Sequence, residues 1–229
     1  MNSDARHAIW ERFELLPEGA AWDRSASTVW VADVHLGKGA VYRSLGMPVP
    51  SGTTLSNLSK LDALLSRTAC AHLVILGDLV HARRALSREL LDRVCAWRRQ
   101  YASLRITLVQ GNHDLRSGPT PPEWEMTTVT EGAMVSAVTC RHEPPPPQGL
   151  EPDGFCFAGH VHPSVVLHGP GRDRLRVPCF FVRRRTLVLP AFGDFTGGAD
   201  IHEAGLGRPT ALFALAGQHV VPIRLTDED

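Results

Sequence analysis

Four short polar motifs, each at or near the end of an apolar stretch, constrain this chain more than any other feature of its sequence. They occupy residues 33–35 (Asp-Val-His), 77–81 (Gly-Asp-Leu-Val-His), 111–114 (Gly-Asn-His-Asp) and 159–162 (Gly-His-Val-His). Aspartate, asparagine and histidine are metal-ligating residue types, and strands that end in them present them at the edge of a sheet. The motifs therefore predict one metal site assembled from distant parts of the chain.

The first half of the chain alternates between predicted strands and predicted helices. Apolar, β-rich runs predict strands at residues 28–32, 72–76 and 105–109. Leucines at helical spacing predict amphipathic helices at 53–67 and 87–101, with Ser87 as the N-cap of the second. This alternation predicts a βαβ half with parallel strands, whose carboxyl ends meet at one edge of the sheet.

Beyond about residue 126 the sequence changes to short β-type runs separated by glycine and proline. We interpret them as an antiparallel second half of one domain spanning residues 1–229, because the polar motifs are divided between the two halves. The four-proline run at 144–147 predicts an extended, exposed loop. The predicted strands of this half cover residues 135–139, 155–158, 165–168, 179–182 and 186–189.

The composition is that of a soluble globular protein, with 43% hydrophobic and 21% charged residues. Lys and Arg together number 24, as do Asp and Glu, so a uniformly basic nucleic-acid-binding surface is not expected, whereas a local basic groove is compatible. The five cysteines have no CxxC spacing, which argues against a structural zinc site or a disulfide framework. With no signal-peptide core and no apolar run of about 18 residues, we expect a cytoplasmic protein with no membrane partner.

The motifs, with His142 between the third and the fourth, offer two aspartates, one asparagine and four histidines as candidate ligands. Asp33 and His35 are two residues apart, so in extended backbone they would point to the same side and reach one ion. The two histidines of the last motif have the same spacing. Asp78 follows a buried run, where an unpaired carboxylate is costly without a cation. Oxygen and imidazole ligands favour Mn, Fe or Zn, and a pair of such ions is suited to activating water against a phosphoester.

On these residues the chain resembles the calcineurin-like metallophosphoesterase superfamily, whose motifs run DxH, GDxx, GNH(D/E), H and GHxH, over roughly residues 28–168. The resemblance implies an α/β (α+β) fold of four layers, in which two mixed β-sheets are flanked by helices. It also implies two divalent metal ions at the strand ends, bridged by Asp78. In that family pattern the first ion takes Asp33, His35, Asp78 and His162, and the second takes Asp78, Asn112, His142 and His160.

Three further residues of the motifs have expected roles near the phosphate. His113 is assigned to neither metal, so we expect it to act as a general acid that protonates the leaving oxygen, with Asp114 fixing its tautomer and orientation. Many superfamily members continue the second motif as GDxxDR, whereas this chain reads GDLVHARR. We expect His81 to take the phosphate-contacting place of the missing arginine. The alternative is a surface-loop histidine.

A narrower resemblance covers nearly the whole chain. The segments at residues 15–22, 33–54, 77–83 and 189–198 are similar to those of the bacterial ligase-associated DNA damage response endonucleases, a clade of the same superfamily. This resemblance implies a Mn²⁺-dependent endonuclease of DNA repair that acts on single-stranded, frayed or flapped DNA. It also implies DNA ligase and helicase repair partners.

Several expectations follow from the narrower resemblance. Lys38, Arg83 and Arg84 become candidates for contacts with the strand backbone. The 189–198 segment either closes the site by a glycine-rich turn or packs Phe192 and Phe195 in the core. The rival function is a small-molecule enzyme of the same superfamily, such as a nucleotide phosphodiesterase or diphosphatase, which the zero net charge favours.

Overall fold

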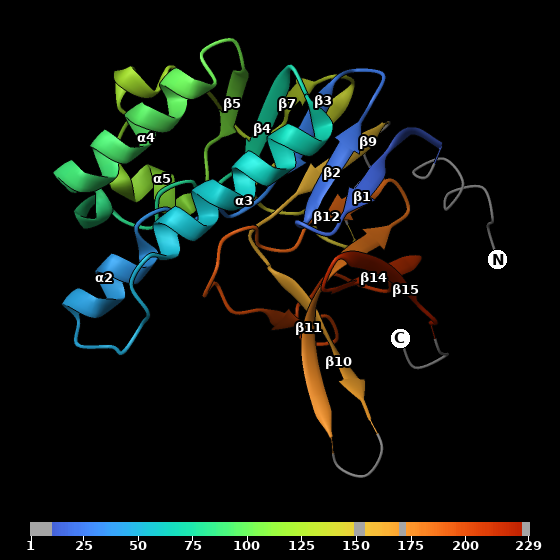
Figure 1. Cartoon of the computed structure of the whole chain (residues 1–229). Helices are drawn as coiled ribbons and strands as arrows, with labels where there is room; N and C mark the ends of the chain where they lie inside the picture. Colours follow the sequence, from blue (N-terminus) through green and yellow to red (C-terminus); the bar gives the residue numbers. More distant parts are fainter. Residues whose placement is uncertain (1–10, 149–153, 170–172, 226–229) are drawn as a thin grey trace.

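The computed structural model describes residues 11–148, 154–169 and 173–225. Two β-sheets pack face to face, and the longer helices lie against the outer face of the first sheet (Figure 1). The hairpin of β10 (Pro163–His168) and β11 (Arg174–Arg183) extends away from the body. None of the described helices is long and apolar enough to cross a membrane.

The first sheet takes its described strands in the order of the sequence. Strands β3 to β6 are parallel, and β1 to β3 are antiparallel. The predicted strands at 72–76 and 105–109 are confirmed with the same bounds, and the one at 28–32 ends one residue earlier. The strands are β1 (Glu14–Leu16), β2 (Ala20–Asp23), β3 (Thr28–Val31), β4 (His72–Leu76), β5 (Arg105–Val109) and β6 (Thr127–Val129).

Two amphipathic helices cover this sheet. They are α3 (Thr53–Thr68) and α4 (Arg88–Gln100), which confirm the two predicted helices. The Ser87 hydroxyl accepts the Leu90 backbone N–H, so Ser87 is the N-cap of α4. Two shorter helices were not predicted, because they lie in or just after a polar motif, where glycine obscures the helical pattern. The shorter elements are α2 (Lys38–Ser44), α5 (Asn112–Ser117) and the 3-10 turns η1 (Arg83–Ala85) and η2 (Pro122–Trp124).

The second sheet is mixed, so the prediction of an antiparallel second half is wrong in part. Strand β9 pairs in parallel with β8 and β12, whereas β11 pairs antiparallel with β10, β12 and β14. Short apolar runs do not encode strand direction, which the connecting loops decide. The remaining strands are β7 (Ala133–Val135), β8 (Val138–Cys140), β9 (Phe155–Ala158), β12 (Thr186–Val188), β13 (Ala199–Asp200), β14 (Ala211–Ala216) and β15 (His219–Ile223).

Alternate residues of the central strands face different hydrophobic clusters. In β3, Val29 and Val31 pack with the helices, whereas Trp30 packs between the sheets. In β11, Phe180 packs between the sheets, whereas Phe181 faces a third cluster on the outer side of the second sheet. Because side chains alternate along a strand, one apolar run per strand supplies two separate cores.

The two mixed sheets and the flanking helices are confirmed, but the expected fourth layer differs. From residue 125 onward the described residues form strands and loops only. The third cluster is instead closed by the loop between β13 and β14, through Ile201 and Leu206. The described part of the chain is therefore a sandwich with one helical layer.

Loops from both sheets meet at one edge of the sandwich. The first motif is joined to the second by backbone hydrogen bonds from Asp33 to Gly77 and from His35 to Asp78. Across the sheets, the Phe192 N–H donates to the Ala32 carbonyl. These bonds bring the polar motifs to one place.

Candidate metal centre

Three groups of metal-ligating side chains occur among the described residues, and two of them are formed by the six expected aspartate and histidine ligands. The third group consists of His35, His81 and His113. Within each group, one ligand atom of every residue lies within 4.8 Å of the others. Four of the six expected side chains are buried, whereas the two histidines of the last motif are partly exposed. The first group is Asp33, His35 and His162, and the second group is Asp78, His142 and His160.

The Asp78 carboxylate lies between the two groups. Its Oδ2 is 3.9 Å from Nε2 of His35, and its Oδ1 is 3.5 Å from Nε2 of His142. One oxygen thus faces each group. This is the arrangement that a carboxylate shared by two cations requires.

Asn112 joins the second group through its amide oxygen. The Asn112 Oδ1 lies 2.9 Å from Nε2 of His142, and Nδ1 of His160 lies 3.0 Å from the same His142 nitrogen. On its other side, His142 places Nδ1 3.1 Å from the Leu76 carbonyl, which accepts its proton. The Nε2 lone pair of His142 therefore points at the other two ligand atoms, an arrangement that a cation between them would stabilise.

Asp33 provides an independent test of whether the site fits a cation. Its side chain is fully buried, and Oδ2 accepts the His160 backbone N–H. Oδ1 has no hydrogen-bond donor among the described residues and lies 3.5 Å from Nε2 of His162. A buried carboxylate oxygen without a donor is costly, and a divalent cation beside His162 would remove that cost. The residues present fit two divalent ions.

The backbone at the ligands is not extended, so the reasoning that placed Asp33 and His35 on one side of a strand is wrong. Both have left-handed backbone, with φ of 54° and 49°, and so do Asp78, His160 and His162. Residues other than glycine adopt this region at a cost, and such residues gather at functional sites. The tight turns, rather than strand alternation, direct these side chains into the site.

Three motif glycines leave room for the ligands. A Cβ at Gly159 would lie 2.6 Å from Oδ2 of Asp33, closer than real contacts allow. A Cβ at Gly111 would collide with Asp78, and one at Gly77 would collide with His142. Each glycine is therefore required by the neighbouring ligand side chain.

Buried surroundings shift the pKa values of two ligands, and in both cases they favour the uncharged form. Burial, followed by the charge of Lys38, holds the pKa of His35 far below its ordinary value, so this imidazole is neutral. Burial raises the pKa of Asp78, which His142 partly offsets. A neutral imidazole is the form that binds a metal, and a cation would return Asp78 to its charged form.

His113 lies beside the ligands with one ring nitrogen directed into the site. Its Nε2 is 3.9 Å from Oδ2 of Asp78, and its Nδ1 contacts the His81 carbonyl oxygen. The expected orientation of His113 by Asp114 is therefore wrong, because Asp114 uses its oxygens elsewhere. Its Oδ2 accepts the Gly111 N–H and its Oδ1 accepts the Val80 N–H, while burial raises its pKa to about 6.

His81 and Lys38 both lie near the His35 ligand. The His81 ring is half-buried, and burial, with the nearby charge of Lys38, lowers its pKa to about 4. Lys38 is only 7% exposed, and its Nζ lies 3.5 Å from the Thr196 carbonyl and 5.6 Å from the Tyr42 ring centre. Arg83 and Arg84 are exposed on η1, with Arg84 close enough to affect His81.

Of the two phenylalanines in the 189–198 segment that could pack in the core, only one does so. Phe192 is fully buried, whereas Phe195 is 55% exposed.

Sequence reasoning also missed Asn57, a buried residue of α3 whose amide donates to the Val34 carbonyl and accepts the Asp194 N–H. A lone asparagine on the apolar stripe of a helix was the signal that could have identified it.

Three further described histidines and the cysteines lie outside the ligand groups of this centre. His72 is buried on β4, beside Thr107, and the described His202 and His219 are exposed. His7 lies outside the described residues. All five cysteines are free, as their spacing predicted.

A family model and solved structures both match this chain. The family model of the calcineurin-like phosphoesterases matches residues 27–168. Among solved structures, the nuclease MPE of Pseudomonas putida is 33% identical with a TM-score of 0.75, covering 92% of this chain and 94% of that chain. YfcE, a phosphoesterase from E. coli, is 16% identical with a TM-score of 0.40, covering 85% and 96%. A search of curated proteins gave no match.

The family model spans more than half of the chain, and the motifs it contains are those that meet at the sheet edge. This protein is a member of the calcineurin-like phosphoesterase family.

Proposed function

We propose that this protein is a binuclear metal-dependent phosphodiesterase, and that it acts as a Mn²⁺-dependent endonuclease on single-stranded or frayed DNA in repair. The position of Asp78, with one carboxylate oxygen toward each ligand group, carries the proposal. The 33% identity to a nuclease across 92% of the chain supports a nucleic-acid substrate. Because both halves contribute ligands, we treat residues 1–229 as one functional domain.

The proposed ligand sets follow the two groups. Oxygen and imidazole ligands suit Mn²⁺, with Fe and Zn as the alternatives. Two ions held there would supply Lewis-acid activation of a water nucleophile and neutralise charge at the phosphate. One ion would take Asp33, His35, Asp78 and His162, and the other would take Asp78, Asn112, His142 and His160.

His113 is the proposed general acid. Its Nδ1 faces the His81 carbonyl and donates to it, so a protonated ring carries its second proton on Nε2, which faces the site. That proton can pass to the leaving oxygen of the phosphodiester. Asp114 supports this geometry indirectly, by holding the backbone of Gly111 and Val80.

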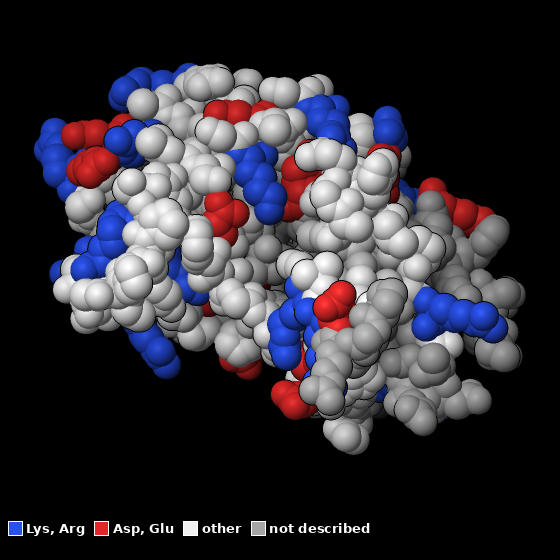
Figure 2. All heavy atoms as spheres, turned by 60° about the horizontal axis from the view of Figure 1, so that its bottom comes forward, with Lys and Arg blue, Asp and Glu red and all other residues white. Residues whose placement is uncertain are grey.

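His81, Lys38, Arg83 and Arg84 are the proposed contacts to the DNA strand. With its pKa at about 4, His81 is neutral at pH 7 and can donate one hydrogen bond to a phosphate oxygen. Lys38 offers a buried ammonium beside the ligands, and the two arginines offer exposed charges. Figure 2 shows acidic and basic side chains interspersed over one face, so strand binding depends on these local cations rather than on a broad basic surface.

Digestion of a circular single-stranded DNA with added Mn²⁺ tests the proposal, with Asp78→Ala as the control. Nicking by the wild type that disappears in the variant is the expected result. Intact circles together with rapid hydrolysis of a nitrophenyl phosphodiester would reject the nuclease and favour a small-molecule phosphodiesterase. A DNA ligase and a helicase are the proposed repair partners, and their absence from a pull-down of the tagged protein out of DNA-damaged cells would argue against them.

A further inference from the structure

The loop between β12 and β13, residues 189–198, is joined to the metal centre by backbone hydrogen bonds from its middle and from the residue that follows it. The Gly193 N–H donates to the Asp33 carbonyl over 3.0 Å, and the Ala199 N–H donates to the His162 carbonyl over 3.0 Å. A Cβ at Gly193 would collide with the Val34 carbonyl, so glycine permits this close approach. The loop therefore has a defined position beside the first ligand group.

A cavity of about 420 Å³ lies under this loop and opens beside the first ligand group. His162 forms one wall, so the cavity adjoins the first ligand group at this residue. In Figure 1 the loop lies between α3 and the β10–β11 hairpin, and both elements contribute walls. The volume falls within the roughly 300–1,000 Å³ of pockets that hold small organic groups. The residues that line the cavity include His162, Phe195, Lys60 and Arg176.

Phe195 is unusual in two respects. Its side chain is 55% exposed, although a large aromatic ring ordinarily buries most of its surface. Its backbone is also left-handed, with φ of 58°, which is strained for a bulky residue. Strain of this kind persists where the surrounding structure holds it and is concentrated at functional sites. An exposed ring at the wall of a cavity beside a phosphoester site is suited to stacking on a nucleobase.

Two cations also line the cavity. The Lys60 ammonium donates to the Phe192 carbonyl over 2.9 Å, and the Arg176 guanidinium donates to the Gly198 carbonyl over 3.0 Å. Each side chain has further donors that these bonds do not use. Of the nearby acids, Asp194 accepts the Ser56 hydroxyl, whereas Asp200 lies 3.8 Å from the Arg176 guanidinium and occupies part of its donor capacity. The cavity thus combines an aromatic ring, which can stack on a base, with hydrogen-bond donors that can bind the polar edge of that base or an adjacent phosphate.

We propose that this cavity binds the nucleoside joined to the scissile phosphate, with its base stacked on Phe195. The inference rests on the proposed phosphodiesterase function and specifies its substrate. A base inside the cavity cannot stay paired in a duplex, because pairing would require a second strand in the same space. The cavity therefore selects an unpaired nucleotide.

Four small phosphodiesters test the proposal separately from the metal chemistry. They are the 5′ and 3′ p-nitrophenyl phosphate esters of thymidine, methyl p-nitrophenyl phosphate and bis-p-nitrophenyl phosphate. We expect one thymidine ester to be hydrolysed with kcat/KM about tenfold above that of the methyl ester, since stacking on an aromatic ring gives roughly this gain. Phe195→Ala should lose most of that advantage, whereas Phe195→Tyr should keep it.

Met134→Ala is the matched control, because Met134 is 73% exposed on β7, at the far edge of the second sheet. It should leave every rate unchanged. An equal preference for the thymidine ester in the wild type and in Phe195→Ala would overturn the inference. A wild type that shows no preference for either thymidine ester would also overturn it. Neither result would contradict the proposed phosphodiesterase function. Hydrolysis of none of the four esters with Mn²⁺ would instead reject the proposed function.

Discussion

The ring of His113 is stacked on the ring of His81, with ring centres 4.9 Å apart and planes at 24°, and its Nδ1 contacts the His81 carbonyl oxygen. The two histidines thus stand as one unit beside Asp78. Burial and the charge of Lys38 keep His81 neutral, while the Nε2 of His113 faces the ligands. For this reason we propose that His81 donates a hydrogen bond to the phosphate, whereas His113 donates a proton to the leaving oxygen.

The His113→Ala variant should retain its metals, and its loss of activity should depend on how much the leaving group of the substrate needs a proton. We expect hydrolysis of DNA to fall about 100- to 10,000-fold, because general-acid catalysis contributes about that much when the leaving oxygen needs a proton. Hydrolysis of bis-p-nitrophenyl phosphate should fall far less, because its leaving group needs no proton. Steady-state rates on both substrates and metal analysis check this. Equal losses on both substrates would exclude the general-acid role.

His81→Ala should weaken transition-state binding without loss of metal. We expect kcat/KM for a phosphodiester to fall roughly tenfold, the value of one good hydrogen bond to a phosphate oxygen. Because the pKa of His81 is about 4, the defect should be nearly constant from pH 6 to pH 8. His81 also lies within ligand distance of His35 and His113, so a fall in metal content would make it a ligand instead.

Gly77→Ala should remove the second metal selectively. The new methyl group would occupy the space of the His142 ring, so we expect bound metal to fall by roughly half, with loss of activity. Gly46→Ala is the matched control: its φ of 79° resembles the 82° of Gly77, but nothing lies within 4 Å of a Cβ there. Elemental analysis of both variants measures the difference. Full metal content in Gly77→Ala would contradict the proposed position of His142.

His72 should make the fold sensitive to acid. Burial, with Arg105 on the neighbouring strand, lowers its pKa to about 4 in the folded protein, below its ordinary value of 6.5. The unfolded chain therefore binds more protons between these values, so stability is complete above about pH 6.5 and is lost as the pH falls toward 4. We expect protonation of this group to lower the free energy of unfolding by about 3 kcal/mol by pH 4.

Chemical denaturation of the wild type and His72→Gln from pH 4 to pH 7 measures that contribution. The glutamine amide can keep the contact with Thr107 and does not titrate. The free energy of unfolding of the variant should vary less with pH. If the free energy of unfolding varies with pH equally in the two proteins, the pKa of His72 is the same in the folded and unfolded states.

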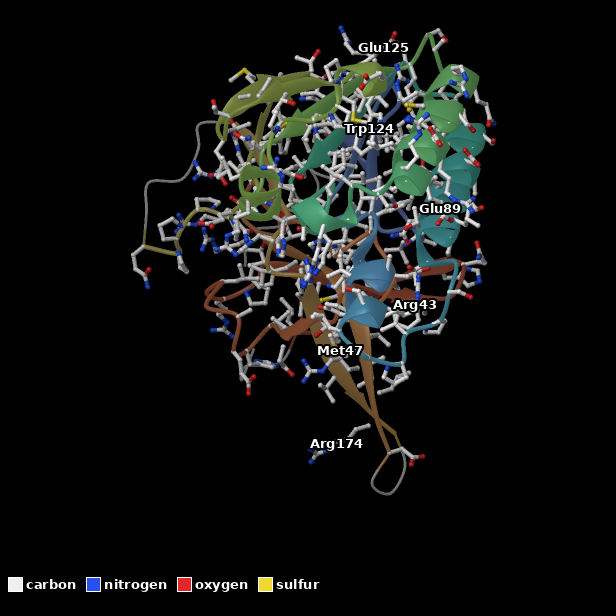
Figure 3. All side chains as sticks on the ribbon, turned by 90° about the vertical axis from the view of Figure 1, so that its left-hand side faces the viewer. Arg43, Met47, Glu89, Trp124, Glu125 and Arg174 are labelled. Carbon is white, nitrogen blue, oxygen red and sulfur yellow. The ribbon has the colours of Figure 1, made fainter. Side chains whose placement is uncertain are left out.

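The exposed end of the β10–β11 hairpin offers a test of how far the DNA path extends. Figure 3 shows Arg174 near the outer end of this hairpin and Met47, which follows α2, at the same end of the molecule. If the strand reaches this end, Arg174→Ala should weaken binding of a long single-stranded oligonucleotide and reduce the salt dependence of its affinity by about one counterion. Binding of a dinucleotide should not change. If the salt dependence of the affinity for the long oligonucleotide does not change, the strand is bound near the metal centre and does not reach the end of the hairpin.

The sequence by itself determined the local elements and the candidate ligands. The strands at 72–76 and 105–109, the helix beginning at Thr53 and the Ser87 cap follow from apolar spacing and side-chain capping, which act over a few residues. The motif residues were named because aspartate, asparagine and histidine are metal-ligating residue types that recur at the predicted strand ends. All these inferences rest on local interactions.

Only the tertiary structure decided what depends on contacts between distant segments. The left-handed turns at Asp33 and His35 are held by bonds to the second motif, and Asp114 binds Val80 and Gly111 rather than the His113 ring. The exposure of Phe195 depends on how its loop crosses the first motif. Backbone turns and burial of this kind are set by partners far away in the sequence, so no local pattern specifies them.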